Sequence, residues 1–152
     1  MKAIGGAVSS VRTPEQTSIA QRWAAIGTST QLQHVWGNVL RDLARRTNLS
    51  ALDAARGYAL LGMTMHDGLL ASFNGKFIYG FWRPVTAIRE AERDGNPATA
   101  ADPTWVSLIP NPPYPAYPGN MTCIASVGSR TLERLFGRDA VAFSVTWTRH
   151  GR

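Results

Sequence analysis

The sequence is poor in cysteine, lysine and acidic residues. A single cysteine, Cys123, excludes an intrachain disulfide and any cysteine-rich metal site. Ten Asp and Glu residues stand against 16 Lys and Arg residues, which gives a net charge of +6. This excess favours an anionic partner. Because the basic residues form no run and are scattered along the chain, with Arg45-Arg46 as the densest pair, we predict that nucleic acid is not that partner.

Long apolar runs are also missing. The N-terminal stretch MKAIGGAVSSVRTPEQ has no continuous apolar core of the length that a signal peptide needs. The most apolar segment, residues 57–73, is interrupted by His66 and Asp67 and is too short to span a bilayer. We therefore predict no membrane span, and the cellular location stays unassigned. The 152 residues suit one domain, which we expect to cover residues 1–152.

The remaining pattern is helical. Thr13, Pro14 and Gln16 form a helix start with a capping box, and Ser50 is a second cap. Apolar periodicity predicts helices over roughly 14–27, 29–48, 51–73, 84–93 and 120–137. The third of these is apolar nearly all round, so we expect it at the centre of the fold. Residues 140–148 alternate and could be extended, but no other strand signal is convincing, and the predicted class is all-α.

Proline is concentrated in one segment. Residues 94–118 hold seven of the nine prolines and show no helical period. The segment predicts one long ordered loop, which in a compact domain is usually functional or wraps a core.

Two cations lie in unusually apolar surroundings in GKFIYGFWRPVTAI. Lys76 and Arg83 are seven residues apart, with Arg83 directly before Pro84. On one helix they would share a face; if the helix breaks first, Arg83 lies at the mouth of the next one. A tetrahedral oxyanion between them would receive a point charge from lysine and a bidentate fork from arginine. Alternatively, both side chains cover apolar surface with their stems and keep their charges in water.

A second candidate anion site lies in YPGNMTCIAS. Gly119 and Asn120 open a predicted helix, whose first backbone N–H groups lack intrahelical partners. The alternative is an ordinary loop-to-helix junction capped by asparagine.

Together these elements resemble the superfamily of vanadium-dependent haloperoxidases and type 2 phosphatidic acid phosphatases, in its soluble haloperoxidase-like branch. The resemblance runs from about Arg12 to Trp147, and Lys-x6-Arg-Pro within KFIYGFWRPVTAI is its specific part. It implies a helical bundle whose site binds phosphate or vanadate. By resemblance, Lys76 and Arg83 clamp the oxyanion, vanadate is the cofactor in the haloperoxidases, and family members are often exported.

The chain departs from the family pattern at two motifs. Where the family has Pro-Ser-Gly-His, this chain has Pro118-Gly119-Asn120-Met121, so histidine is replaced by Met121 without a gap, or by Asn120 with one deletion. Asparagine can donate a hydrogen bond to an oxyanion but cannot shuttle a proton. The family's third motif, Ser-Arg followed five residues later by His, is absent.

Two short segments imitate the third motif only in part. Ser129-Arg130 is followed by Phe136 at the histidine position, and His150 lies in a tail without a matching arginine. His34 and His66 are expected to be ordinary helix residues rather than catalytic ones.

Two functions remain open. The first is a partial haloperoxidase-like or phosphatase-like domain that binds phosphate or vanadate through Lys76, Arg83, Gly119 and Asn120, with little or no catalysis alone. Catalytic residues are not assigned, and no metal-ion site is predicted. The second is a non-catalytic helical module, or a truncated gene product, that associates with another chain or with itself through uncovered apolar faces.

Overall fold

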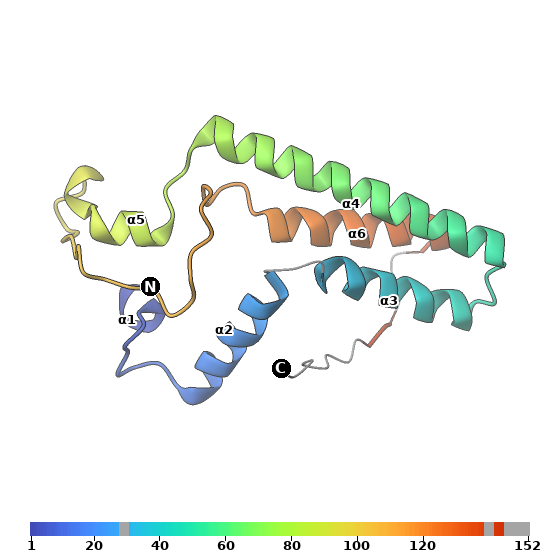
Figure 1. The fold of residues 1–152 in the computed structure, drawn as a ribbon, viewed down its shortest axis with the longest axis horizontal. Coiled ribbons are helices and arrows are strands. Elements are labelled where there is room, and N and C mark those ends of the chain that lie inside the picture. The colour runs from blue at the N-terminus through green and yellow to red at the C-terminus, as the bar shows by residue number, and fades with distance from the viewer. Residues whose placement is uncertain (28–30, 139–141, 145–152) are drawn as a thin grey trace. The chain divides into compact units, whose positions relative to one another are not determined.

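The computed structural model describes residues 1–27, 31–138 and 142–144, and within this part it is helical (Figure 1). Its helices are α1 (Lys2–Gly5), α2 (Pro14–Gly27), α3 (Gln31–Arg46), α4 (Ala51–Tyr79), α5 (Pro84–Arg89) and α6 (Asn120–Phe136), with a 3-10 turn, η1, at Ala91–Arg93. The described residues form no strand; one isolated antiparallel bridge joins Gly6 and Ser107. The predicted all-α class is confirmed. Of the expected extended segment 140–148, only residues 142–144 are described, and they form no strand.

The predicted helix starts are confirmed by their caps. Before α2, the Thr13 hydroxyl accepts the Gln16 N–H at 3.1 Å, and the Gln16 side chain accepts the Thr13 N–H at 3.0 Å. Before α4, the Ser50 hydroxyl accepts the Asp53 N–H at 3.1 Å. Two boundaries differ from the prediction: α4 continues six residues beyond Phe73, and the helix expected over 84–93 ends at Arg89 before η1.

The chain divides into two compact units, and the expectation of a single domain stays a prediction. The first unit comprises residues 1–27 and 72–119, and the second residues 28–71 and 120–152. Helix α4 contributes its last turns to the first unit and its longer N-terminal part to the second.

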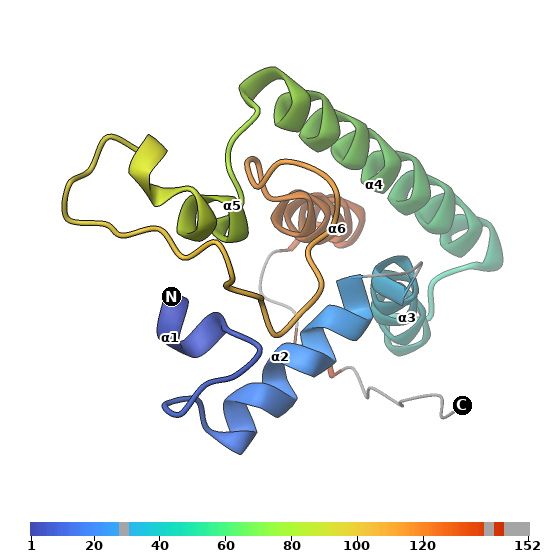
Figure 2. The ribbon, with the colours of Figure 1, turned by 60° about the vertical axis from the view of Figure 1, so that its left-hand side comes forward.

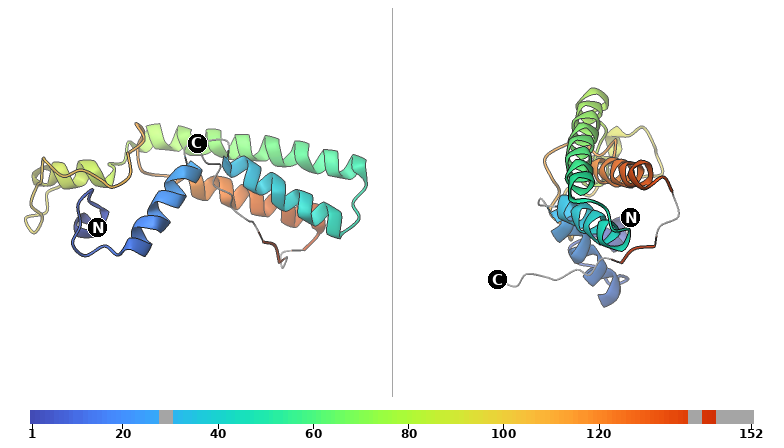
Figure 3. Two further views of the ribbon diagram at one scale, coloured as in Figure 1. Left: turned by 60° about the horizontal axis from the view of Figure 1, so that its bottom comes forward. Right: turned by 90° about the vertical axis from the view of Figure 1, so that its right-hand side faces the viewer.

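The second unit holds the apolar core. α3, the N-terminal part of α4 and α6 lie side by side (Figures 1 and 3). The core residues are buried leucines, a valine, a methionine and an isoleucine: Val39, Leu40, Leu43, Leu61, Met65, Ile124 and Leu132. Gly128 lets α6 approach the Trp36 ring, because a Cβ at this position would lie 2.6 Å from a ring atom.

The first unit is built around irregular backbone. After η1 the chain runs through the proline-rich segment and returns beside the N-terminal residues (Figure 2), where the Leu108 N–H donates to Gly5 O at 2.9 Å. The Arg12 guanidinium reinforces this region by donating to Ile4 O and Gly6 O. Residues 94–118 therefore form the predicted ordered loop, whose polar backbone is held by specific contacts.

The helix expected at the centre of the fold, α4, is buried by the described residues on one face and exposed on another. Leu61 and Met65 are buried, whereas Leu52, Met63 and Leu70 are 80%, 57% and 56% exposed. A helix that is apolar all round can be buried on any face, but the described residues cover only one face of α4.

Candidate functional site

Lys76 lies in the last turn of α4 and is 1% exposed, the largest side chain to be so completely buried among the described residues. Its ammonium donates to Pro115 O at 2.9 Å and to Ala116 O at 3.0 Å. A buried ammonium is tolerated only when it is hydrogen-bonded or paired, and these carbonyls supply part of that compensation. The proline-rich segment thus holds the charge of Lys76 at the end of the helix.

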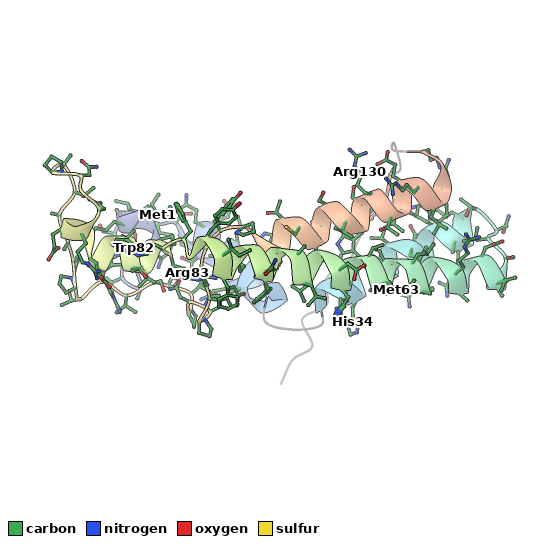
Figure 4. All side chains as sticks on the ribbon, turned by 90° about the horizontal axis from the view of Figure 1, so that it is seen from above. Met1, His34, Met63, Trp82, Arg83 and Arg130 are labelled. Carbon is green, nitrogen blue, oxygen red and sulfur yellow. The ribbon has the colours of Figure 1, made fainter. Side chains whose placement is uncertain are left out.

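The break between α4 and α5 places the second cation. Gly80 has a φ of +57°, a left-handed conformation that glycine adopts without steric cost, and its N–H closes the last turn on Lys76 O at 2.9 Å. The chain is then extended at Arg83, with a φ of −78° and a ψ of 156°, and Pro84 is the first residue of α5. Of the two geometries left open by the sequence, Arg83 therefore lies at the mouth of the next helix (Figure 4).

Arg83 contacts the same segment as Lys76. Its Nε donates to Tyr114 O, and its guanidinium carbon lies 4.7 Å from the centroid of the Tyr114 ring. The other guanidinium N–H groups make no hydrogen bond within the part of the chain that the structure describes. Because Arg83 is half-buried, these N–H groups are only partly hydrated, and they remain able to donate hydrogen bonds to a ligand.

Tyr114 is the common neighbour of the two cations. The Lys76 Nζ lies 5.1 Å from the Tyr114 ring centroid, and the Phe73 ring meets the same ring edge-on at 4.9 Å. Both distances from a cation to the ring fall within the range of cation–π attraction. The ring therefore attracts both cations, which offsets part of the repulsion between their positive charges.

The sequence did not single out Tyr114. In the sequence Tyr114 is an aromatic residue between prolines, in PNPPYPAYP. This pattern by itself indicates only a rigid loop. Its role becomes evident once α4 and the loop are seen to converge.

The end of the proline-rich segment packs against α4. A Cβ at Gly75 would lie 3.1 Å from two ring atoms of Pro118, so glycine allows this close approach. The Tyr117 ring packs edge-on against those of Tyr79 and Phe81, at 5.5 and 6.3 Å. The predicted site residue Gly119 directly follows Pro118, is exposed and belongs to the first unit.

The last predicted site residue, Asn120, lies in the second unit. Asn120 is the first residue of α6 and is half-buried, and Met121 follows it in the helix. The structure thus brings Lys76 and Arg83 together on Tyr114. The predicted participation of Gly119 and Asn120 in an anion site stays a prediction.

His34 and His66 lie on helices, and the segment that imitates the third motif lies on α6. His34 on α3 and His66 on α4 are exposed helix residues, whereas His150 lies outside the described residues. Arg130 forms an exposed ion pair with Glu133 at 2.7 Å, and Phe136 packs against the apolar core.

Neither a metal centre nor a membrane span is formed by the described residues. Among residues 1–27, 31–138 and 142–144, no group of three or more His, Cys, Asp or Glu side chains is arranged to hold a metal ion. In the same ranges, no helix combines the length and apolar composition that crossing a membrane requires.

Comparison with known proteins places this arrangement in a family context. Residues 56–151 match the family model described as the VCPO second helical-bundle domain. The chain is also 31% identical to the vanadium chloroperoxidase of Curvularia inaequalis over 161 aligned positions, which cover 88% of this chain and 25% of that protein. It therefore spans about a quarter of the length of this relative. No solved structure matches the chain significantly.

Proposed function

Because the chain belongs to the vanadium haloperoxidase-like superfamily as a partial helical domain of the VCPO type, we propose that it binds a phosphate-like oxyanion, phosphate or vanadate, at Lys76 and Arg83. One observation carries the proposal: both cations of the Lys-x6-Arg-Pro element lie against Tyr114, and Arg83 keeps guanidinium donors that no described residue uses. The anion would accept from these donors, and the Lys76 charge nearby would add to the attraction.

The donor set fits an oxyanion held through its oxygen atoms. It does not fit a vanadate that needs an imidazole ligand, because the position of the second-motif histidine is occupied by Met121 or Asn120. Nucleophilic catalysis requires a nucleophile with a matched base or acid, and neither motif position supplies one. The proposed function is therefore oxyanion binding with little or no turnover by this chain alone.

Affinity should be weak. The remaining donors of one arginine and the charge of one lysine suggest a Kd in the millimolar to high-micromolar range, roughly 4 to 6 kcal/mol. The hydrogen bonds of Lys76 to two carbonyls leave its ammonium little capacity to contact the anion directly, which keeps the affinity low.

Titration of vanadate and phosphate, followed by calorimetry and by vanadium or phosphorus NMR, tests the proposal. Arg83→Gln should abolish binding, and Lys76→Ala should weaken it. Arg93→Ala is the matched control, because Arg93 also stacks on an aromatic ring, at 5.8 Å from Trp82, but is largely exposed and is paired with Glu90. If Arg83→Gln and Arg93→Ala bind alike while both keep the wild-type unfolding temperature, Lys76 and Arg83 serve only to hold the loop.

A second function, as a non-catalytic helical interaction module, is favoured by a different observation. Where α4 ends, Phe77, Ile78 and Tyr79 are 69%, 69% and 67% exposed, and Phe81 is 63% exposed. Exposed apolar side chains mark interaction surfaces where they form a contiguous patch, and these four are gathered at the junction of α4 and α5. Sedimentation velocity over a hundredfold range of protein concentration tests self-association, which Phe77→Ser with Phe81→Ser should weaken.

A further inference from the structure

A cavity of about 620 Å³ lies in the second unit, beside the N-terminal part of α4 and the C-terminal part of α6, and the proposed oxyanion site does not involve it. Its volume falls within the range of small-molecule binding sites. The side chains that line it determine which class of molecule it can hold.

The two helices that line the cavity are antiparallel neighbours (Figure 3). The hydroxyls of Thr64 and Thr131 are 2.9 Å apart, and a Cβ at Gly57 would lie 2.8 Å from a Leu135 methyl group. Position 57 of α4 therefore lies near the level of position 135 of α6, and position 64 near that of position 131, to within a few residues. This register indicates which lining residues lie at similar levels.

The lining residues repeat at helical spacing. On α4 they are Asp53, Arg56, Leu60 and Thr64, and on α6 Val127, Arg130, Thr131, Arg134 and Leu135. Steps of three and four residues keep each row on one face of its helix. The cavity is consequently a groove between two side-chain rows, with leucine and valine side chains alternating with arginines.

The groove carries a surplus of positive charge. Three arginines line it against one carboxylate, Asp53, which accepts a hydrogen bond from the Ser50 hydroxyl at 2.6 Å as part of the helix cap. Arg130, visible on α6 in Figure 4, is paired with Glu133 at 2.7 Å. Arg56 and Arg134 make no hydrogen bond or ion pair with any residue in the described ranges.

The register brings these two unpaired arginines to neighbouring levels. Arg56 precedes position 57, which lies near the level of Leu135, and Arg134 precedes Leu135 on the antiparallel helix. Their backbone levels along the helix axes thus differ by about 3 Å if the Gly57–Leu135 contact sets the register and by about 7–8 Å if the Thr64–Thr131 contact does, at 1.5 Å per residue. Leu60 lies near the level of Arg134, and Val127 lies two helical turns further along α6, so the two side chains give the groove an apolar floor beside and beyond the arginines.

We propose that this groove binds a small amphiphilic anion, a molecule with an apolar body and a sulfonate, carboxylate or phosphate head. The head lies between Arg56 and Arg134, where two guanidinium forks can donate to its oxygen atoms. The apolar body lies along Leu60 and Val127. Burial of that body is required, because exposed charge pairs alone contribute little binding free energy.

A matched pair of fluorescent probes tests the proposal on the intact chain. The anionic probe is 8-anilinonaphthalene-1-sulfonate, the neutral one is N-phenyl-1-naphthylamine, and inorganic phosphate serves as a head group without a body. The anionic probe should bind with one-to-one stoichiometry and at least tenfold more tightly than either of the others. If the anionic and the neutral probe bind with equal affinity, the arginines do not contribute to binding. If phosphate binds as tightly as the anionic probe, the apolar side chains do not contribute.

Variants locate the site. Arg56→Gln and Arg134→Gln should each weaken the anionic probe about fivefold, the effect of one exposed charge contact. Arg22→Gln should leave it unchanged, since Arg22 is an exposed arginine of α2 in the other unit. Because aromatic sulfonates also bind unfolded protein, each variant must keep the wild-type unfolding temperature. Folded Arg56→Gln and Arg134→Gln proteins that bind like wild type would refute the proposed site.

Discussion

Lys76 and Arg83 lie against the same aromatic ring, with the Lys76 Nζ 5.1 Å and the Arg83 guanidinium carbon 4.7 Å from the centroid of Tyr114. Both also donate to backbone carbonyls of residues 114–116. Backbone carbonyls and one aromatic ring of the same loop thus contact two cations that lie seven residues apart in the sequence. The two carbonyls that accept from Lys76 supply part of the hydrogen bonding that a buried ammonium requires.

Tyr114→Leu should destabilise the protein by about 1–3 kcal/mol, because both cations lose the aromatic face and the Phe73 ring loses its edge-on partner. Tyr114→Phe is the matched control and should stay within about 0.5 kcal/mol of wild type, since the ring is retained. Urea unfolding followed by circular dichroism measures both values. Equal losses for the two variants would assign the stabilisation to the hydroxyl rather than to the ring.

Two helix glycines should respond oppositely to the same change. Gly128→Ala should destabilise by about 1–3 kcal/mol, because its Cβ would lie 2.6 Å from the Trp36 ring. Gly62→Ala should stabilise by about 0.5–1 kcal/mol, because a Cβ there meets nothing within 4 Å and alanine lowers the entropy of the unfolded chain. Thermal unfolding compares the pair, and a loss at Gly62 would indicate an unrecognised contact on that face of α4.

The helices from α2 to α6 were predictable from the sequence because their signals are local, whereas α1 was not predicted. Thr13 with Gln16, and Ser50 with Asp53, form caps within four residues of chain. The end of α4 was not predictable, because residues 74–79 neither forbid nor require a helix. The helix ends at Gly80, which is left-handed. A glycine in the sequence permits this conformation but does not by itself predict it.

The two cations of the candidate site were predictable, whereas their partner was not. Lys76 and Arg83 stand out as charges within an apolar stretch, which already implies a compensating group. Tyr114 is 31 residues further along the chain than Arg83, and their contact depends on how the proline-rich segment returns. Such non-local pairing leaves no periodicity in the sequence. The burial of only one face of α4 was hidden for the same reason, because composition does not specify how many neighbours a helix has.

Lowering the pH should destabilise the folded protein through protonation of Asp102. Its carboxylate accepts a hydrogen bond from the Lys2 ammonium, an ion pair at 2.9 Å, and another from the Thr104 hydroxyl, which together lower its pKa. Because the pKa is lower in the folded state than in the unfolded state, this stabilisation is present above the unfolded value and is lost as pH falls through the folded one.

Wild type and Asp102→Asn should therefore differ by a constant amount between pH 7 and about pH 5, and the difference should shrink below about pH 4. Thermal unfolding across this range measures it. Salt at 0.5 M should reduce the difference, because the pair is exposed and screened. A difference that stays the same down to pH 2 would assign the effect of the substitution to packing instead.

Lys76→Met separates the structural role of the buried ammonium from its proposed role in anion binding. Methionine fills a similar volume but leaves the carbonyls of Pro115 and Ala116 without this donor, which should cost about 1–3 kcal/mol of stability. Lys2→Met, at a surface ion pair screened by solvent, should cost much less. If the ammonium also attracts the oxyanion, Lys76→Met should weaken vanadate binding at a temperature where the variant is still folded, while Lys2→Met should not. A folded Lys76→Met protein that binds vanadate as wild type does would confine Lys76 to holding the loop and leave anion binding to Arg83 alone.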